Sequence, residues 1–370
     1  MHSRSSHSKM VADQRDHPVT AGTHRSCAPV FVVGSPRSGT TLLYDMLLSA
    51  GGFALYLGES SIFNVVAPRF GDLRARRNRE KMLEVWLGSR LFRVSGLGRE
   101  EVENKILSEC RNPGDFLRIV MDALARKQNA QRWAGNTPEE ILYLPFIKQT
   151  IPNALFIHVL RDGRDVALSL SRRRYIRPFP WKERETTVGA AIYWAWIVER
   201  GRRLGQELGA DYTEIHFEQL VAEPQIALAR LSSFLDHALD YERIQRVALG
   251  SVAKPNTSFK TVPEAEFNPV GRWKEQLTPR QLTRIEGLIG ATLTDLGYPL
   301  VTPGKEAGNR LELAGRLFLY RRFFDLKLRW KNSAIVRLFR PELTSHEVDE
   351  IVIADEMAAA KLGSTSVQVP

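Results

Sequence analysis

The ten residues GSPRSGTTLL (34–43) directly follow the apolar run APVFVV (28–33). A buried strand, a turn bounded by Gly34 and Gly39, and the start of a helix with periodic apolar residues therefore fit into one short stretch. This order is typical of a phosphate-binding loop, in which backbone N–H groups at a helix N-terminus hold an anion. The stretch predicts an α/β fold with an anion site at its first strand–helix junction.

The cation of this loop is an arginine. In a nucleotide-binding P-loop a lysine follows the second glycine, whereas Thr40 stands at that position here. Arg37 lies inside the loop, and its guanidinium fork suits a terminal anionic group. Ser38, Thr40 and Thr41 add hydroxyl donors, and Gly39 lets the backbone approach closely. A plain glycine turn with an exposed arginine is the alternative, but packing alone does not explain so many donors in one turn.

The bulk composition bounds the class of protein. The chain has 370 residues, 43% hydrophobic and 25% charged, which is an ordinary globular balance. Its net charge of +10 favours anionic partners. Two cysteines, Cys27 and Cys110, exclude a disulfide framework and fit a reducing compartment. The first 27 residues lack the apolar core of a secretory signal, and no apolar run is long enough to span a membrane. We expect a cytoplasmic protein with a disordered leader at 1–27.

Strand-like and helix-like segments alternate along the chain, which predicts a central, mostly parallel sheet. The predicted strands are 30–33, 53–57, 154–160 and 213–217. The predicted helices include 40–50, 187–208 and 224–235, together with a charged covering layer of helices at 72–130. Thr137 precedes a proline and two acids, so we expect it to cap a further helix.

A second arginine-rich loop follows another predicted strand. The sequence RDGR (161–164) lies at the carboxyl end of strand 154–160, where open α/β sheets bind ligands. On a helix that begins there, Ser169 and Arg173 are four residues apart and share a face. Together with Arg161 they predict a second phosphate site, and we expect the two aspartates nearby to orient the arginines. An arginine-rich solvated helix is the alternative.

Together the two loops resemble those of the sulfotransferases that use 3′-phosphoadenosine 5′-phosphosulfate (PAPS). The first loop resembles their 5′-phosphosulfate loop, with arginine as in the tyrosylprotein branch and many bacterial members. The second is similar to their 3′-phosphate element, RDGRDVALSL in this chain. The stretches WAGNTPEEI, IHFEQLVAEP and GRWKEQLTP agree in order, so the resemblance covers residues 30–298.

The resemblance implies a P-loop-like three-layer sandwich. It places a sulfotransferase domain at 28–300 and leaves residues 301–370 as a C-terminal helical extension and tail. It further implies that PAPS donates a sulfuryl group to a hydroxyl and that no metal is needed. The implied donor-binding residues are Arg37, Ser38, Gly39, Thr40, Thr41, Arg161, Ser169, Arg173, Phe217, Ser258, Arg272 and Lys274.

Individual roles follow from the same resemblance. Arg37 would stabilise the charge that develops on the leaving group. Phe217 stands where relatives often have a tyrosine, and its ring would stack on adenine. Glu59, in the segment LGESS, is similar to the acid of the tyrosylprotein branch and is our predicted general base. For Trp273 and for the mid-strand His158 we expect packing roles.

One position departs from the pattern. Relatives commonly carry a lysine where this chain has Asn136, and that lysine is implied to steady the leaving phosphate. Either Arg37 acts alone, or Lys274 substitutes, or the chain is a catalytically weak protein that binds PAPS or adenosine 3′,5′-bisphosphate (PAP). A P-loop small-molecule kinase is a further alternative, but it would require the missing lysine and Mg²⁺.

The acceptor class stays open between glycan, lipid, small metabolite and peptide tyrosine. Basic stretches at 74–81, 172–177 and 200–203 favour an acidic glycan or peptide, whereas the aromatic segment 175–181 suits an apolar acceptor. We expect no nucleic-acid partner, and the sequence does not predict the oligomeric state. Residues 309–340 form a basic, apolar helix that either packs on the domain or lies on an anionic membrane surface.

Overall fold

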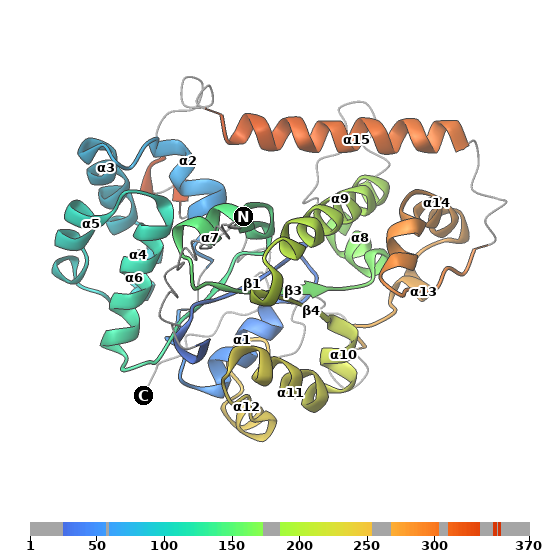
Figure 1. Cartoon of the computed structure of the whole chain (residues 1–370). Helices are drawn as coiled ribbons and strands as arrows, with labels where there is room; N and C mark the ends of the chain where they lie inside the picture. Colours follow the sequence, from blue (N-terminus) through green and yellow to red (C-terminus); the bar gives the residue numbers. More distant parts are fainter. Residues whose placement is uncertain are drawn as a thin grey trace, which may run out of the picture.

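Four parallel strands form the central sheet, in the order β2-β1-β3-β4 (Figure 1). The strands are β1 (Val30–Gly34), β2 (Ala134–Asn136), β3 (Leu155–Leu160) and β4 (Tyr212–His216). In the register, Val30 is opposite Leu155 and Phe156 is opposite Tyr212. The structure is a computed structural model, and it describes residues 25–56, 59–172, 186–253, 268–302, 310–333, 343–345 and 347–348. The α/β class and the central parallel sheet predicted from the sequence are confirmed.

Helices cover both faces of this sheet and make three layers (Figure 1). One face carries α1 (Thr40–Ala50), α10 (Phe217–Ala222), α11 (Pro224–Leu235) and α12 (Tyr241–Val247). The other face carries α7 (Leu144–Thr150), α8 (Gly163–Arg172) and α9 (Thr186–Gln206). Since α1 follows β1 and α8 follows the neighbouring β3, the chain leaves these two strands toward opposite faces. Such a point is where open α/β sheets bind ligands.

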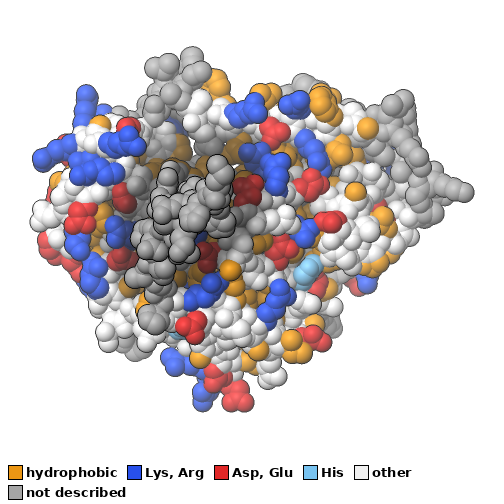
Figure 2. Space-filling model, viewed as in Figure 1, with side chains coloured by type: hydrophobic (Ala, Val, Ile, Leu, Met, Phe, Trp, Pro, Cys, Tyr) orange, Lys and Arg blue, Asp and Glu red, His pale blue; other side chains and the backbone are white. Residues whose placement is uncertain are grey.

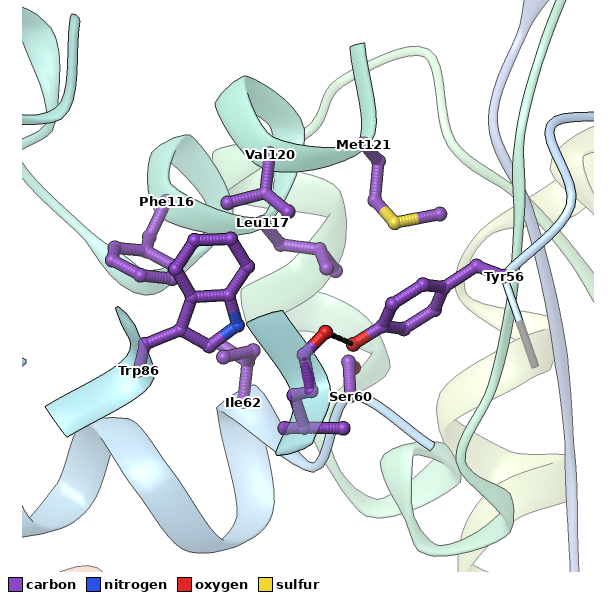
Figure 3. Close-up of a pocket in the computed structure, with 9 residues that line it drawn as sticks. Tyr56, Ser60, Ile62, Trp86, Phe116, Leu117, Val120 and Met121 are labelled. Carbon is purple, nitrogen blue, oxygen red and sulfur yellow. Dashed lines mark hydrogen bonds between the residues drawn. The ribbon is translucent and has the colours of Figure 1, made fainter. Parts of the chain in front are cut away.

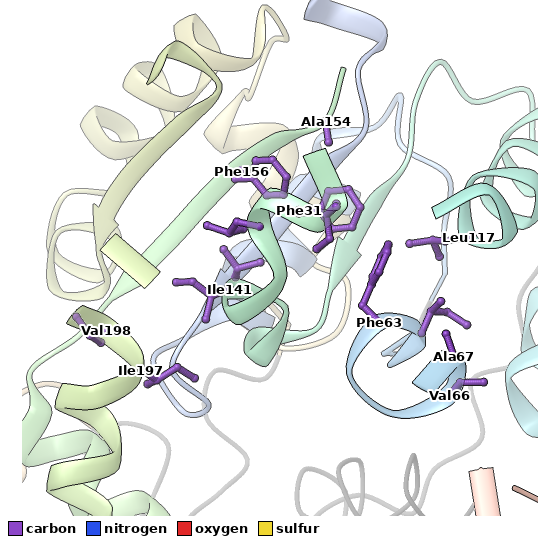
Figure 4. Packing of buried hydrophobic residues seen from close by; sticks show 14 of the residues in the cluster. Phe31, Phe63, Val66, Ala67, Leu117, Ile141, Ala154, Phe156, Ile197 and Val198 are labelled. Carbon is purple, nitrogen blue, oxygen red and sulfur yellow. The ribbon is translucent and has the colours of Figure 1, made fainter. Parts of the chain in front are cut away.

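Alternating residues of each strand divide the core between the two faces. Val30 and Val32 pack in the cluster under α1, whereas Phe31 and Val33 pack in the cluster under α9. This alternation follows from the two-residue period of a strand buried on both faces. Phe31 stacks on Phe156 at a centroid distance of 5.5 Å (Figure 4).

The predicted covering layer at 72–130 is helical and breaks at glycines. It packs beside the β2 edge of the sheet (Figure 1). Its helices and the short one before it are α2 (Ala67–Phe70), α3 (Arg76–Leu87), α4 (Arg90–Ser95), α5 (Glu103–Glu109) and α6 (Pro113–Lys127). Helix α4 ends at Gly96, which has the left-handed φ of 65° that favours glycine. The side chain of Asn112 caps α6 by accepting a hydrogen bond from the amide of Asp115.

Three expectations need correction. The described part of segment 53–57 makes only an isolated bridge from Phe53 to Arg132, so β2 takes the place of the predicted strand. Thr137 precedes a 3-10 helix (Pro138–Tyr143) but does not cap it, and its hydroxyl oxygen accepts from the amide of Ser61. Of the predicted disordered leader, residues 25–27 are folded onto the domain, with Arg25 3.4 Å from Asp211, and residues 1–24 lie outside the described residues.

Three helices follow in the described residues between 273 and 331. They are α13 (Trp273–Gln276), α14 (Pro279–Asp295) and α15 (Arg310–Lys331). Thr278 and Gln281 form a capping box at the start of α14. Of the predicted helix at 309–340, the structure describes residues 310–333, and α15 ends at Lys331. No helix in the described ranges combines the length and apolar character needed to cross a bilayer.

Candidate active site

The first loop is a tight turn between β1 and α1. The amide and the hydroxyl of Ser38 both donate to the carbonyl oxygen of Ser35, at 3.1 and 2.7 Å. Arg37 and Gly39 have left-handed φ values of 73° and 100°. The first helical hydrogen bond runs from Leu43 to Gly39, and no side chain caps this helix. The first-turn amides of α1 therefore have no intrahelical partner and are suited to bind an anion.

Only a glycine fits at position 39. A Cβ atom added there would lie 2.2 Å from Cδ2 of Phe217, far inside van der Waals contact. The ring of Phe217 is buried at 5% exposure and lies directly behind the loop. Its contact with adenine stays a prediction.

The second loop reaches the first through Arg161. One terminal nitrogen donates to the carbonyl oxygen of Arg37 at 3.0 Å, and the other donates to that of Pro269 at 2.6 Å. The guanidinium carbon lies 4.4 Å from the centre of the Phe217 ring. Burial lowers the pKa of Arg161, and its Nε has no hydrogen-bond partner among the residues that the structure describes. The side chain thus has a buried donor left for an anion.

Arg37 closes the contact between the two loops. Its Nε donates to the hydroxyl oxygen of Ser169 at 3.1 Å, and Ser169 belongs to α8. Arg37, Arg161 and Ser169, predicted from two separate motifs, therefore meet at one place. Arg173 and Ser258, the other predicted phosphate and lid residues, lie outside the described residues.

The two aspartates of the second loop have different roles. Asp162 pairs with Arg164 at 2.8 Å, and Arg164 also pairs with Glu286 at 2.6 Å, as expected for an aspartate that orients an arginine. Asp165 is fully buried and lies 4.0 Å from Arg161, as expected, but it also accepts from the amides of Gly271 and Trp273, at 2.8 and 3.0 Å. Asp165 therefore fixes a third segment of the chain, a role that sequence reasoning missed.

That third segment carries the remaining predicted residues. Arg272 is buried at 8% exposure, and burial, with Arg161 nearby, lowers its pKa to about 10. Lys274 is exposed, and its Nζ lies 5.8 Å from the centre of the Trp273 ring. Trp273 is buried and donates to Asp162 at 3.0 Å, which confirms its packing role.

The segment of Glu59 lies at the carboxyl end of β2. Glu59 is half-buried, and the residues after it are fastened to the chain beyond β2. The hydroxyl of Ser60 donates to Glu140 at 3.4 Å, and the amide of Ser61 donates to Thr137 at 3.4 Å. Glu140 is fully buried, and burial raises its pKa to about 8. The sequence did not predict that Glu140 is buried. Two adjacent acids after a proline indicated only a favourable interaction with the helix dipole.

Beside this segment are an uncharged amide and an apolar pocket. Asn136 is 6% exposed, and its Oδ1 has no hydrogen-bond partner within the described part of the chain. The pocket borders Ser60 and lies under helices α3 and α6 (Figure 3). Its lining residues are Tyr56, Ser60, Ile62, Trp86, Leu91, Phe116, Leu117, Val120 and Met121. The hydroxyl of Tyr56 donates to the carbonyl oxygen of Leu91 at 3.3 Å (Figure 3).

Several other candidate groups are engaged elsewhere. Arg200 pairs with Asp325 at 3.2 Å and Arg202 with Glu214 at 3.0 Å, so the basic stretch 200–203 is in part used within the chain. His158 is fully buried, and burial lowers its pKa to about 3, which confirms the expected packed histidine. The described residues contain no group of three or more His, Cys, Asp and Glu side chains that could hold a metal ion.

Comparisons with known proteins agree with this geometry. The model of the sulfotransferase family matches residues 29–241. Protein-tyrosine sulfotransferase A of Caenorhabditis elegans is 25% identical over 288 residues, which are 75% of this chain and 69% of that protein. Protein-tyrosine sulfotransferase 1 of Danio rerio is 25% identical over 280 residues, 73% of this chain and 72% of that protein.

A solved structure supports the same fold. The sulfotransferase domain from the curacin biosynthetic pathway aligns with a TM-score of 0.52 and 17% identity, over 74% of this chain and 99% of that domain. Since the family model matches more than half of the chain, from β1 to the start of α12, the chain belongs to the sulfotransferase family and is a sulfuryl-transferring enzyme.

Proposed function

We propose that this enzyme uses PAPS as its sulfuryl donor. The observation that carries the proposal is the contact of the two loops, in which Arg161 donates to Arg37 and Arg37 donates to Ser169. PAPS has a phosphate at one end and a phosphosulfate at the other. Such a donor needs two anion sites that lie next to each other, as these two loops do. The open amides of α1 and the buried Nε of Arg161 fit such a group.

Each loop holds one end of the donor in this proposal. Residues 37–41 hold the phosphosulfate, and Arg161, Ser169 and Arg173 hold the 3′-phosphate. Phe217, Ser258, Arg272 and Lys274 complete the site around the adenosine. When bound, PAPS supplies an electrophilic sulfur and a bisphosphate leaving group. We propose no metal requirement.

The protein's own chemistry is acid–base and electrostatic. Glu59 accepts the proton of the attacking hydroxyl, for which a general base contributes about 10²–10⁴-fold. Arg37 and the first-turn amides of α1 offset the negative charge that grows on the leaving side. Sulfuryl transfer resembles phosphoryl transfer in depending on alignment and charge more than on covalent catalysis.

The acceptor carries a hydroxyl. Two of the relatives named above are protein-tyrosine sulfotransferases, so peptide tyrosine stands beside glycan, lipid and small metabolite as a candidate. The aromatic segment 175–181 lies outside the described residues and does not decide between them. The cytoplasmic location and the absence of a nucleic-acid partner stay predictions. Family membership decides against the small-molecule kinase.

Calorimetry tests the donor site. We expect PAP to bind at micromolar or tighter affinity and adenosine 5′-phosphate to bind far more weakly, because only PAP fills both loops. Equal affinities would contradict the 3′-phosphate assignment. Incubation of radiolabelled PAPS with acceptor extracts then tests turnover and identifies the acceptor class. Tight PAP binding with no labelled product would favour the weak binder implied by Asn136.

The variant Glu59→Gln tests the general base. It removes the proton acceptor while keeping the size of the side chain, so we expect turnover to fall by roughly 10²-fold or more with PAP affinity unchanged. Glu242→Gln, on exposed α12, is the matched control. Unchanged turnover in Glu59→Gln would dismiss Glu59 as the base.

A further inference from the structure

In the part of the chain that the structure describes, helix α15 packs on the domain through one buried face. Tyr320 and Phe324 are buried at 6% and 4% exposure, and the Phe324 ring packs 5.5 Å from that of Trp196 on α9. Asp325 on the same helix pairs with Arg200 of α9. Figure 1 shows α15 lying across the outer side of α9, away from the sheet. The helix is thus held rigidly with its opposite face directed outward.

That outward face carries an apolar stripe. Leu319, Phe323, Leu326 and Trp330 are 55%, 39%, 63% and 48% exposed. Their spacing of four, three and four residues aligns them along one side of a helix. Phe318, at 58% exposure, lies beyond Arg322, whose guanidinium carbon is 5.4 Å from the centre of the Phe318 ring. A large apolar side chain that is half exposed is common, but an aligned row of them marks an interaction surface.

Basic side chains border the stripe on both sides. By helical position, Arg322 and Arg329 lie along one edge and Arg316 and Lys327 along the other. Asp325 is the only acid between residues 314 and 333, and it is turned toward Arg200. Figure 2 shows hydrophobic and basic side chains gathered along the top edge of the molecule, where α15 lies.

We propose that the outer face of α15 lies on an anionic lipid surface. The apolar stripe would enter the boundary between headgroups and acyl chains, while the arginines and lysines extend to the lipid phosphates. Each such cation strengthens attachment roughly fivefold. The net charge of +10 on the chain adds long-range attraction. This proposal does not depend on the identity of the sulfuryl donor.

The basic residues that border the stripe favour a lipid surface over a second copy of the chain as the partner of α15. If two α15 helices paired through their stripes, the basic borders of both would face each other and repel. An anionic bilayer instead complements both borders at once. Because the stripe occupies one face of a helix whose other face is buried in the domain, α15 would lie in the plane of the bilayer surface and would not span the bilayer.

Vesicle flotation with the full chain tests the proposal. We expect flotation with phosphatidylcholine vesicles that contain phosphatidylglycerol, no flotation with pure phosphatidylcholine, and release by added salt. The double variant Leu326→Asp/Trp330→Asp should lower the bound fraction roughly tenfold or more. Ile226→Asp, at a 67% exposed position of α11, is the matched control and should bind as the unchanged chain does.

A second variant tests the basic borders without touching the stripe. Arg322→Gln/Arg329→Gln should weaken binding to the anionic vesicles by roughly fivefold for each lost cation. PAP affinity is measured for every variant, and an unchanged value shows that the fold and the donor site are intact. Failure of the donor proposal would instead remove PAP binding from the unchanged chain and leave flotation as it was.

Three outcomes would overturn the membrane proposal. One is equal flotation with neutral and anionic vesicles, and another is an equal loss of binding in Ile226→Asp. The third is absence of flotation together with a dimer in sedimentation that Leu326→Asp/Trp330→Asp dissolves. That result would assign the face to a second copy of the chain.

Discussion

The two loops that we propose to bind the donor's anionic groups are stabilised in different ways. The loop after β1 depends on backbone conformation, with left-handed φ values at Arg37 and Gly39 and an uncapped helix start. The loop after β3 depends on buried side chains, in which Asp162, Asp165 and Arg161 each hold another part of the chain. The first loop is therefore sensitive to added atoms and the second to lost charges.

The second loop also supports the first. A left-handed conformation costs a non-glycine residue about 1–2 kcal/mol, so the peptide of Arg37 needs external support. Arg161 gives that support by donating to the carbonyl oxygen of Arg37. The first loop contacts the second in return, because the Nε of Arg37 donates to the hydroxyl oxygen of Ser169 at 3.1 Å.

The largest expected effect follows from Arg161→Ala. It removes a buried cation that holds Arg37, Pro269 and the predicted 3′-phosphate, and it leaves Asp165 without its nearest cation, at 4.0 Å. We expect PAP affinity to fall by ~2–5 kcal/mol in calorimetry. The affinity for adenosine 5′-phosphate should fall less, because it lacks the 3′-phosphate and feels only the loss of support for Arg37.

Arg161→Lys sharpens this prediction. Lysine keeps the positive charge but cannot donate along the two directions that a guanidinium fork provides. We expect it to recover part of the PAP affinity and little of the turnover. A full recovery of both would show that charge alone, without the bond to Arg37, accounts for the role of position 161.

The first loop is broken by an added methyl group. Gly39→Ala places a Cβ atom 2.2 Å from the Phe217 ring at a left-handed position. Gly297→Ala is the matched control, since Gly297 has a φ of 80° with nothing within 4 Å. The control measures strain alone, which we expect to be about 1 kcal/mol in urea unfolding. Gly39→Ala should lose ~1–3 kcal/mol beyond that. Equal losses of stability in the two variants would show that the Phe217 ring can move away from the added methyl group without cost.

The sequence predicts the first loop better than its surroundings. A glycine-bounded turn between a strand and a helix leaves one local geometry, and α1 begins at Thr40 as expected. The apolar run at 53–57 also has strand character, yet the edge beside β1 is taken by Ala134–Asn136. Sheet pairing is a tertiary choice, and a short strand with a central glycine gives little local signal.

The contacts that join the two loops are the other part that sequence patterns do not supply. Asp165 accepts hydrogen bonds from amides more than one hundred positions away, and the fully buried Glu140 accepts one from Ser60, eighty positions away. Partners of buried charges are set by which loops the sheet order brings together. The motifs could therefore predict Arg37, Arg161 and Ser169 as anion-binding residues without predicting that they touch.

Asp165→Asn tests how the second loop fixes the third segment. The new amide group directs N–H donors toward the amides of Gly271 and Trp273, so at least one of the two hydrogen bonds is lost. We expect unfolding in urea to require ~1–3 kcal/mol less free energy. Asp122→Asn, on half-exposed α6, is the control. A change equal to that of the control would remove Asp165 from the support of the site.

A pH-dependent effect contrasts these paired carboxylates with Glu140, which has a hydroxyl partner and no neighbouring cation within the described residues, so it is buried as the neutral acid. Burial raises its pKa from 4.5 to about 8, and the folded state keeps a proton that the unfolded chain loses between those values. Stability therefore falls as pH rises, by at most about 1.4 kcal/mol per pH unit, and levels off above pH 8.

Comparison of the unchanged chain with Glu140→Gln isolates this titration. Glutamine mimics the neutral acid, so the variant should gain stability relative to the unchanged chain as pH rises from 5 to 8. His158 has the opposite dependence, since its lowered pKa makes stability fall on acidification, but both chains contain it and the difference cancels. Urea unfolding across this pH range gives the difference directly. If the difference in unfolding free energy between the two chains does not change with pH, Glu140 is ionised in the folded state. A buried carboxylate at this place would then be stable without an arginine such as Arg161 or Arg164 of the second loop.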